Sequence, residues 1–317
     1  MVKNEIWNAV SNASVIAIGG HVNPDGDCIG SCLSMYNYIK KVYPDKKVTV
    51  YLENIPEVFK YMAGSDMVAT DYVSNDPDLF ISLDCSDKER LGQAEQIFDH
   101  TPSTINIDHH ISNLCFALIN HYVAESSATC EVLYELYEPE LIDKDIAECL
   151  YTGIIHDTGV FKYSNTSCRT MEIAGILMSK GIDHTSIIEN TFYEKSYSAN
   201  RFLGKCLLES RLLYDDRVIL CVATRELFDS CGATKEDTDG IVSVLLQTKG
   251  VEVSVFVYER GENEYKASLR ASKDADMSKV ALVFGGGGHK KAAGCTLRGE
   301  LDKELSKLLK EVGIALL

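Results

Sequence analysis

The sequence of 317 residues has no uninterrupted apolar run long enough to cross a membrane as a helix. A membrane-spanning helix needs about 18 or more consecutive, predominantly apolar residues. The first residues, MVKNEIWNAV, also lack the apolar segment that marks a secretory signal peptide. We therefore expect a soluble, cytoplasmic protein with no membrane partner.

Positive charge is scarce in this chain. It carries 31 Lys and Arg against 47 Asp and Glu, which gives a formal net charge of −16 and a sequence pI near 4.9. A protein that holds a long nucleic-acid duplex makes many Lys and Arg contacts with phosphates. The composition therefore argues against a long-duplex partner, whereas a short anionic substrate held by metal ions and a few local cations remains compatible.

Paired-cysteine motifs and the common nucleotide-loop motifs are also missing. The eleven cysteines include no C-x-x-C pair and are odd in number, which favours free thiols in a reducing compartment. The chain contains no P-loop, no G-x-G-x-x-G, no Ser-His-Asp order and no internal repeat. A disulfide framework, a P-loop enzyme and a repeat protein are therefore not indicated.

Short apolar runs alternate with helical patterns in the first half of the chain. Runs at 14–18, 48–52, 79–83 and 105–107 predict strands, and a helical pattern at 29–42 separates the first two. Strands separated by helices indicate crossover connections and a mostly parallel sheet. We predict an α/β fold of this kind for residues 1–190.

A second α/β pattern begins after a long helical stretch. Residues 185–213 read as helical, without a strand, and we expect a helical connector at 191–213. A strand, a helix, a hairpin-like strand pair and an amphipathic C-terminal helix follow within residues 214–317, which predict a smaller α/β domain.

Several imidazoles and carboxylates follow the predicted strands or end a predicted helix. They are His21, Asp25, Asp27, Asp84, Asp108, His109, His110 and Asp157. Each has an ordinary explanation alone, such as a turn, a helix cap or a helix-end pair. Because sites in parallel sheets form beyond the carboxyl ends of the strands, together they favour two metal sites that share one carboxylate. The mixed ligands suit Mn²⁺, and also Mg²⁺, Fe²⁺, Co²⁺ or Zn²⁺.

Five motifs carry a family resemblance over nearly the whole chain, namely HVNPDGD, SLDCSD, NIDHHISN, GIIHDTGVF and FGGGGHKKAAG. In this order they resemble the DHH phosphoesterase family, in the subfamily with the first type of DHH-associated C-terminal domain. The size resembles the compact bacterial branch of nanoRNases, pAp phosphatases and cyclic-di-AMP or pApA phosphodiesterases. The resemblance implies hydrolysis of a short nucleotide substrate by a metal-bridged hydroxide.

The resemblance also implies individual roles in a centre of two ions, usually Mn²⁺. One ion would be held by His21, Asp25 and Asp84, and the other by Asp27, Asp84, His109 and Asp157, so that Asp84 bridges both. His110 would contact the scissile phosphate or protonate the leaving oxygen, and Asp108 would orient the histidines. In the smaller domain, the substrate's phosphate or nucleotide end would be bound by Arg270, Gly286, Gly287, Gly288 and His289.

Some alternatives stay open from the sequence. A family II inorganic pyrophosphatase shares the DHH motifs but lacks the GGGH loop, and a catalytically inactive nucleotide-binding module would resemble this chain in outline. A solvated surface is as good an explanation of Lys290 and Lys291 as a substrate contact. The preferred nucleotide is open, and a homodimer is possible.

Overall fold

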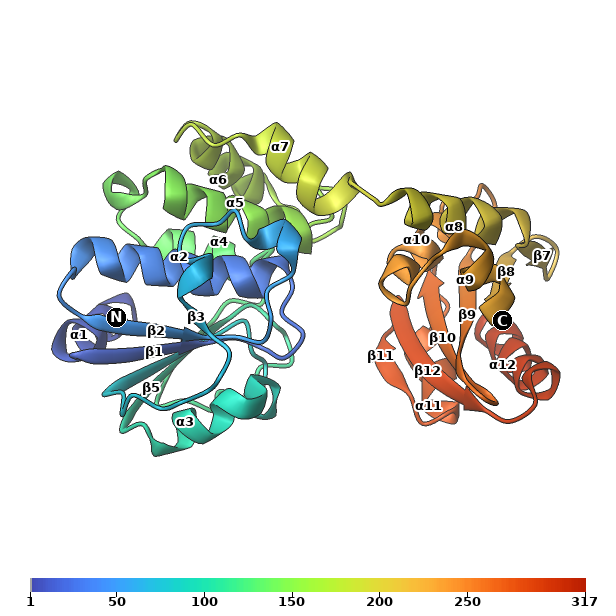
Figure 1. Ribbon diagram of the computed structural model, residues 1–317, viewed down its shortest axis with the longest axis horizontal. Helices are drawn as coiled ribbons and strands as arrows, with labels where there is room; N and C mark the ends of the chain where they lie inside the picture. Colours follow the sequence, from blue (N-terminus) through green and yellow to red (C-terminus); the bar gives the residue numbers. More distant parts are fainter. Residues whose placement is uncertain (1) are drawn as a thin grey trace. The chain divides into compact units, whose positions relative to one another are not determined.

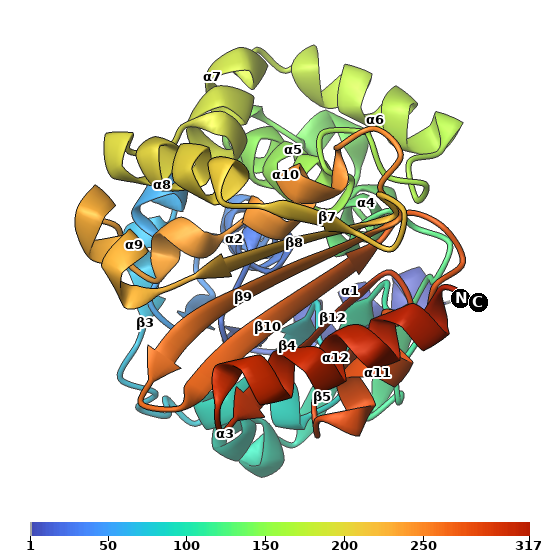
Figure 2. The same ribbon diagram turned by 90° about the vertical axis from the view of Figure 1, so that its right-hand side faces the viewer.

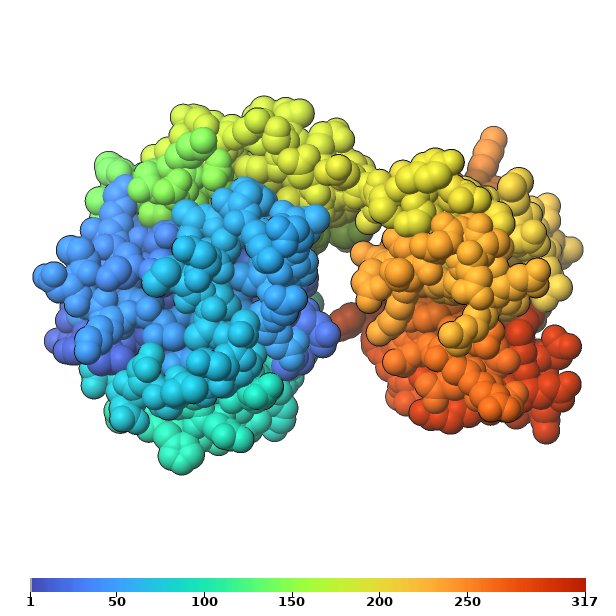
Figure 3. Space-filling view, in the orientation of Figure 1, coloured from blue at the N-terminus to red at the C-terminus, as the bar shows by residue number. Residues whose placement is uncertain are grey.

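The computed structural model describes residues 2–317, which divide into two compact units at Glu194 and Lys195 (Figure 1). Within these residues, no helix is both long and apolar enough to span a membrane. All eleven cysteines are free thiols. Figure 3 shows the same view with all atoms, in which the N-terminal part of the chain, in blue, covers much of one face of the first unit.

The first unit is built on a six-stranded sheet in which every neighbouring pair is parallel. In the order β3-β2-β1-β4-β5-β6, its strands are β3 (Val68–Ala69), β2 (Lys47–Tyr51), β1 (Val15–Gly19), β4 (Leu79–Leu83), β5 (Ser103–Asp108) and β6 (Ile119–Tyr122). The predicted mostly parallel α/β fold is confirmed. The two edge strands β3 and β6 were not predicted, because they are short and only partly buried.

Helices cover both faces of this sheet. The helices are α1 (Val2–Asn12), α2 (Gly26–Val42), α3 (Glu95–His100), α4 (Thr129–Leu136), α5 (Lys144–Asp157), α6 (Cys168–Met178) and α7 (His184–Ile188). Side chains such as Ile16 and Ile18 of β1 join the large core under α2, α4 and α5, whereas Ala17 between them joins the smaller core under α3. This alternation follows from the pleat, which points successive side chains to opposite faces.

Short 3₁₀- or π-helical segments also occur in the connections of the two units. They are η1 (Glu57–Phe59), η2 (Ser65–Met67), η3 (Glu89–Ala94), η4 (Pro139–Leu141), the π-helical η5 (Glu189–Tyr193) and η6 (Glu236–Thr238).

The strand order changes direction between β1 and β4. From β1 the chain goes to β2 and β3 on one side, then returns to place β4 on the other side of β1. The loops that leave the carboxyl ends of these two strands therefore diverge, which opens a space between them. His21 lies just after β1 and Asp84 just after β4, so both belong to this switch point.

The second unit contains a mixed six-stranded sheet in the order β11-β12-β10-β9-β8-β7 (Figure 2). Its strands are β7 (Arg211–Leu213), β8 (Val218–Ala223), β9 (Val253–Gly261), β10 (Glu264–Ala271), β11 (Gly287–His289) and β12 (Ala292–Arg298), and only β8 and β9 pair in parallel. One face packs on α8 (Tyr197–Leu208), α9 (Arg225–Cys231) and α10 (Ile241–Leu246), and the other on α11 (Met277–Val283) and α12 (Leu301–Ala315).

The stretch expected to be a helical connector, residues 191–213, is more varied than its pattern indicates. Helix α8 buries Phe202 and Cys206 in the core of the second unit, together with Ile219 of β8. The expectation of helix through residue 213 is wrong, because Arg211–Leu213 forms β7 and pairs antiparallel with β8. Three residues are too few for a period to show, so pairing with β8 decides their conformation.

The packing of α2 against α5 in the first unit depends on glycine. A Cβ atom at Gly30 of α2 would lie 2.4 Å from the carbonyl oxygen of Cys149 in α5, and one at Gly153 of α5 would lie 2.5 Å from Oδ1 of Asp27 in α2. Backbone atoms cannot move aside as a flexible side chain can. The two helices can therefore approach this closely only while both positions lack a side chain.

We expect Gly30→Ala to lower the free energy of unfolding by about 1–3 kcal/mol, because the added methyl group forces α2 and α5 apart. Urea denaturation followed by circular dichroism measures the change. Gly175→Ala in α6 is the matched control, since a Cβ atom there meets nothing within 4 Å; helix propensity predicts a gain of up to about 1 kcal/mol. Equal effects at the two positions would contradict the close-packing explanation.

Candidate metal centre

Side chains from four loops and helix ends of the first unit converge at the switch point. Three overlapping groups have potential ligand atoms within 4.8 Å of one another: His21, Cys28 and Asp84; Asp84, His109 and His110; Asp27, His109 and Asp157. Asp84 belongs to two of them and His109 to two. The sequence-predicted metal ligands therefore lie together, and Asp25 joins them through a 3.7 Å approach of its Oδ1 to His21 Nε2.

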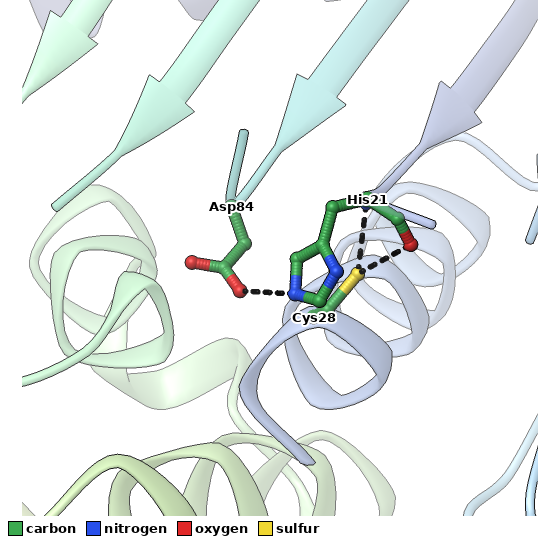
Figure 4. Close-up of side chains that lie close together, drawn as sticks. All are labelled: His21, Cys28 and Asp84. Atoms are coloured by element: carbon green, nitrogen blue, oxygen red, sulfur yellow. Dashed lines mark hydrogen bonds and ion pairs between the residues drawn. The ribbon is translucent and has the colours of Figure 1, made fainter. Parts of the chain in front are cut away.

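His21 presents one ring nitrogen to the centre. Its Nδ1 donates to the carbonyl oxygen of Val22 at 2.9 Å when it carries the proton, which leaves Nε2 free to act as a ligand. Nε2 faces Asp84 Oδ2 at 3.4 Å (Figure 4). Burial alone would lower the pKa of His21, but Asp25 and Asp84 raise it well above the usual value.

Cys28 fixes the loop that carries His21. The main-chain N–H of His21 donates to Cys28 Sγ at 3.2 Å, and the thiol lies 3.9 Å from the carbonyl oxygen of the same residue (Figure 4). Burial raises the pKa of this thiol well above its usual value. Cys28 is thus a buried core residue that also positions the main chain of His21.

Asp84 stands between the two halves of the centre. Its Oδ2 faces His21, whereas its Oδ1 lies 3.7 Å from His109 Nε2 and accepts a hydrogen bond from the Thr129 hydroxyl at 2.9 Å. Its φ of 57° lies in the left-handed region, which costs energy for a residue with a side chain. The turn directly after β4 is thus strained, and it directs a carboxylate that is 2% exposed toward both sides.

Asp27 is completely buried and caps a helix that is distant in sequence. Its carboxylate accepts hydrogen bonds from the main-chain N–H groups of Thr129 at 2.6 Å and Cys130 at 3.0 Å, the first residues of α4. Burial and the nearby charges of Asp84 and Asp157 raise its pKa well above the ordinary value.

The start of α4 has no side-chain cap from its own N-cap residue. The N-cap residue of α4 is Ala128, so the helix relies on Asp27 of α2 for its free N–H groups. The carbonyl oxygen of Ser126 accepts a hydrogen bond from His109 Nδ1 at 3.3 Å.

His109 faces the second half of the centre. With Nδ1 fixed by Ser126, its Nε2 lies 3.0 Å from Asp157 Oδ2 at the end of α5 and 4.0 Å from Asp27 Oδ2. Burial opposes protonation, but these carboxylates raise the pKa of His109 to about 10. Burial raises the pKa of Asp157, and the nearby His109 only partly offsets this.

His110 has a separate environment from its neighbour. Its Nδ1 donates to Asp108 Oδ1 at 2.7 Å, and the other oxygen of Asp108 accepts from Asn113 Nδ2 at 2.6 Å. Asp108 is fully buried, whereas the side chain of His110 is 35% exposed. Asp108 raises the pKa of His110 by this hydrogen bond. Our expectation that Asp108 orients both histidines is thus wrong for His109, which Ser126 holds.

The donor set fits divalent cations. Asp27 and Asp84 are almost inaccessible to water, yet among residues 2–317 neither they, Asp25 nor Asp157 forms an ion pair with Lys or Arg. Buried carboxylates require compensating charge, and histidines alone offset only part of it. Carboxylates combined with imidazoles suit Mn²⁺, Mg²⁺ or Co²⁺.

The packing of His156 next to the centre could not be predicted from the sequence. Its ring contacts Phe59 and Phe192, and its Nε2 donates to the Thr191 hydroxyl at 3.0 Å, since that hydroxyl itself donates to the Ile187 carbonyl. A Cβ atom at Gly26, the first residue of α2, would lie 2.3 Å from this ring. Burial lowers the pKa of His156 to about 4, so the ring is neutral and packs as an uncharged group.

The expected substrate-binding residues of the second unit lie on β11, directly before it at Gly286, or on β10 at Arg270. His289 pairs with Ala292 of β12, and Ala292 pairs with Arg270 of β10 on its other side, so the two cationic or polar side chains are at one level of the sheet. A Cβ atom added at Gly286 would lie 2.3 Å from the carbonyl oxygen of Gly294. One added at Gly287 would have no neighbouring atom within 4 Å.

The glycine run therefore has two physical causes. Gly286 and Gly288 let β11 approach β12, and Gly288 also has a φ of 136° that disfavours side chains. At Gly287, no other part of the protein lies within 4 Å of the place that a Cβ atom would occupy, so the main chain there is accessible. Lys290 lies 3.6 Å from Asp274, and Lys291 donates to the carbonyl oxygen of Lys273.

Comparisons with known proteins agree with this arrangement. A model of the DHH family, N-terminal domain, matches residues 15–154, and a model of the DHHA1 domain matches residues 219–313. The chain belongs to the DHH family. It is therefore a hydrolase, a phosphoesterase that acts on nucleotides, and DHH phosphoesterases depend on metal ions.

Several relatives cover nearly the whole chain. The bifunctional oligoribonuclease and PAP phosphatase NrnA of Thermus thermophilus is 29% identical over 97% of this chain and 91% of its own length. The cyclic-di-AMP phosphodiesterase PdeA of Listeria monocytogenes is 24% identical over 98% of this chain but only 49% of its own length. The solved structure of an exopolyphosphatase-related protein from Bacteroides fragilis is 30% identical, covers 99% of this chain and 96% of that chain, and has a TM-score of 0.91.

The electrostatics of the DHH centre predict how stability depends on pH without metal. The positive charge of His109 stabilises the fold fully below its ordinary pKa of 6.5, and this contribution is lost as the pH rises toward about 10. Burial of Asp27 and Asp157 disfavours their ionised forms in the metal-free fold, and this destabilisation grows as the pH rises from their ordinary pKa of 3.8 toward their raised values.

We therefore expect divalent cations to raise the melting temperature more at ~pH 9 than at ~pH 6.5, because the metal-free protein loses stability over this range. Differential scanning calorimetry with EDTA or Mg²⁺ measures both values. Asp27→Asn is the matched control and should reduce the pH dependence. An equal gain from Mg²⁺ at both pH values would contradict the expectation.

The different partners of the two adjacent histidines predict different consequences of replacing them. His109→Ala should lower the Mn²⁺ content of the protein, whereas His110→Gln should retain Mn²⁺ and mainly lower kcat. Elemental analysis after dialysis measures the first effect, and steady-state kinetics the second. Equal loss of metal from both variants would show that this division is wrong.

Proposed function

We propose that the chain is a two-metal phosphoesterase that hydrolyses short nucleotides, such as nanoRNA, pApA, pAp or cyclic-di-AMP. The observation that carries this proposal is the position of Asp84, whose two carboxylate oxygens face different imidazoles, His21 and His109. A carboxylate held in this way can bridge two cations, because each oxygen has lone pairs to share.

In this proposal, one cation is held by His21, Asp25 and Asp84, and the other by Asp27, Asp84, His109 and Asp157. Two divalent cations, Mn²⁺ by preference, would make water a stronger nucleophile and offset charge on the phosphoryl oxygens. The chain's own contribution is to fix the ligand atoms. Val22 and Ser126 hold the Nδ1 atoms of His21 and His109, so that both Nε2 atoms face inward.

His110 is the proposed proton donor. Its hydrogen bond from Nδ1 to Asp108 raises its pKa, so it stays protonated to a higher pH than an ordinary histidine. Its partly exposed ring can then donate from Nε2 to a phosphoryl oxygen or to the leaving oxygen. Asp108 acts as a positioning residue, and Asn113 holds its other oxygen.

We assign binding of the substrate's other end to the second unit. Arg270 and His289 lie at one level of its sheet and would donate to a phosphate, while the open backbone at Gly287 lets an anion approach closely. Gly286 and Gly288 support this by placing β11 against β12. The first unit would thus be the catalytic domain and the second the substrate-binding domain.

A homodimer remains part of the proposal. Strand β6 lies at the edge of the first sheet, and the exposed apolar side chains nearest to it in sequence are Leu114, Leu118 and Tyr122. Exposed apolar groups at a sheet edge favour association.

The cytoplasmic location of the protein also stays a prediction.

Asp84→Ala should abolish hydrolysis while the fold is retained. Loss of the bridging carboxylate removes several kcal/mol of charge stabilisation, which corresponds to a fall in kcat on the order of 10³-fold or more. Assays of phosphate or nucleotide release measure the effect, and circular dichroism checks the fold. The control is Asp66→Ala, at an exposed carboxylate outside the centre, and near-normal turnover of Asp84→Ala would refute the two-metal proposal.

The substrate is identified by a panel. Metal-stripped protein resupplied with Mn²⁺ is assayed against pAp, pApA, cyclic-di-AMP, RNA of two to five nucleotides and inorganic pyrophosphate. We expect turnover of at least one short nucleotide. Turnover of pyrophosphate alone would favour a pyrophosphatase, and nucleotide binding without any hydrolysis would favour an inactive binding module.

A further inference from the structure

The second unit contains a surface cavity that the proposed function does not use. It has a volume of about 350 Å³ and is lined by side chains of α9, of the loop after α9 and of the end of β9. The gold and orange segment that carries it lies at the surface of this unit in Figure 3. Its size is at the lower end of the range of about 300–1,000 Å³ that is typical of small-ligand sites.

Three cationic side chains line this cavity, namely Arg225, Lys235 and Arg260. None of their side chains forms a hydrogen bond or an ion pair with any residue in the described range, 2–317. Several other cations of this unit do form ion pairs, as Arg298 does with Glu264 and Arg217 with Glu252. In a chain with a net charge of −16, three unpaired cations around one cavity leave positive charge available for an anion.

One wall of the cavity is aromatic. The ring centroids of Phe228 and Tyr258 are 6.2 Å apart with an interplanar angle of 57°, and the ring centroid of Phe202 in α8 lies 4.4 Å from that of Phe228. Tyr258 is only 8% exposed, and its hydroxyl has no hydrogen-bond partner within residues 2–317. Rings held in this way offer a surface on which a heterocyclic base can stack, together with a free hydroxyl.

Two carboxylates limit the charge that the cavity can accept. Glu259 already accepts a hydrogen bond from the main-chain N–H of Arg225 at 3.2 Å, and Asp229 is the other acid in the lining. The three cationic side chains and these two carboxylates together give the lining of the cavity an excess of one positive charge. A single phosphate suits this balance better than a polyphosphate, and the carboxylates can accept hydrogen bonds from ribose hydroxyls or a base amino group.

The cavity is separate from the residues around β11. In the pairing of β9 with β10, Arg270 is opposite Ser254, whereas Arg260 lies six residues further along β9. At about 3.3 Å per residue, this separates Arg260 from the level of Arg270 by roughly 20 Å. One mononucleotide cannot contact both places.

We propose that this cavity binds one nucleoside monophosphate, with the base against Phe228 and Tyr258 and the phosphate against Arg225, Lys235 and Arg260. The proposal rests on the proposed function only for the supply of this ligand. The nucleotide has two possible sources, a free mononucleotide released by hydrolysis or the terminal nucleotide of an oligonucleotide substrate.

Isothermal titration calorimetry of the full-length, Mn²⁺-loaded protein with AMP tests the site. His289→Ala is used as the background, so that binding near β11 is weakened and the cavity is observed. We expect AMP to bind in this background and to bind about tenfold or more weakly when Arg225→Gln and Arg260→Gln are added. Lys235→Gln is a second, single variant, and Arg298→Gln is the matched control that should leave the affinity unchanged.

The reagents and kinetics separate the alternatives. Adenosine and inorganic phosphate should each bind more weakly than AMP, because each satisfies only one side of the cavity. If the source is an oligonucleotide, the double Arg variant raises the KM for a five-nucleotide RNA more than the KM for pApA. If the source is a free mononucleotide, the double Arg variant changes the KM for the five-nucleotide RNA and the KM for pApA by the same factor, and it still binds AMP more weakly.

Two results would overturn the site: no AMP binding in the His289→Ala background, or the same affinity with and without the two Arg substitutions. Hydrolysis of pApA by the wild-type protein is measured in parallel. An active enzyme that fails the AMP test therefore counts against this cavity and leaves the proposed function intact.

Discussion

The burial of carboxylates at one end of a parallel sheet is the constraint on which the first unit depends. Asp27 and Asp108 are completely buried and Asp84 is 2% exposed. Removing ionised groups from water is costly unless hydrogen bonds and opposite charges replace the lost hydration. The surrounding structure supplies these partners in three different ways.

Each carboxylate receives a distinct set of partners. Asp27 takes the free N–H groups at the start of α4, Asp84 takes the Thr129 hydroxyl and faces two imidazoles, and Asp108 takes His110 and Asn113. The helix start and the carboxylate satisfy each other in the first case. Burial opposes ionisation of Asp108, but the hydrogen bond from His110 lowers its pKa, whereas burial raises the pKa of Asp27. The remaining need for positive charge is concentrated on the Asp27 and Asp84 side, where we place the cations.

The sheet topology explains why these groups meet. Reversal of strand order between β1 and β4 brings the loops with His21 and Asp84 to one opening, and the strained turn at Asp84 directs its carboxylate there. The end of β5 adds His109 from the neighbouring strand, and the end of α5 adds Asp157. Strain of this kind persists only where the surrounding contacts determine the backbone.

Much of this could be predicted from the sequence. The central strands are continuous apolar runs, and the polar residues directly after them therefore locate the site. Helix α5 and its N-cap Asp143 were also predictable, because this carboxylate accepts from the N–H of Ile146 within the same turn.

The remaining features depend on contacts between distant residues. No local pattern shows that Asp27 caps α4, whose first N–H group belongs to a residue 102 positions away. The short strands β3, β6 and β7 carry too few residues for a period, so pairing with their neighbours defines them. The contact of His156 with Gly26 likewise appears only after α2 and α5 have packed.

The most direct test of the central claim is the position of metal in a crystal of the wild-type protein grown with Mn²⁺. Anomalous scattering at the manganese edge locates the ions independently of the protein density. We predict two peaks, one near His21 and Asp25 and one near His109 and Asp157, with Asp84 between them. A single peak that does not contact Asp84, or no peak at saturating Mn²⁺, would contradict the claim.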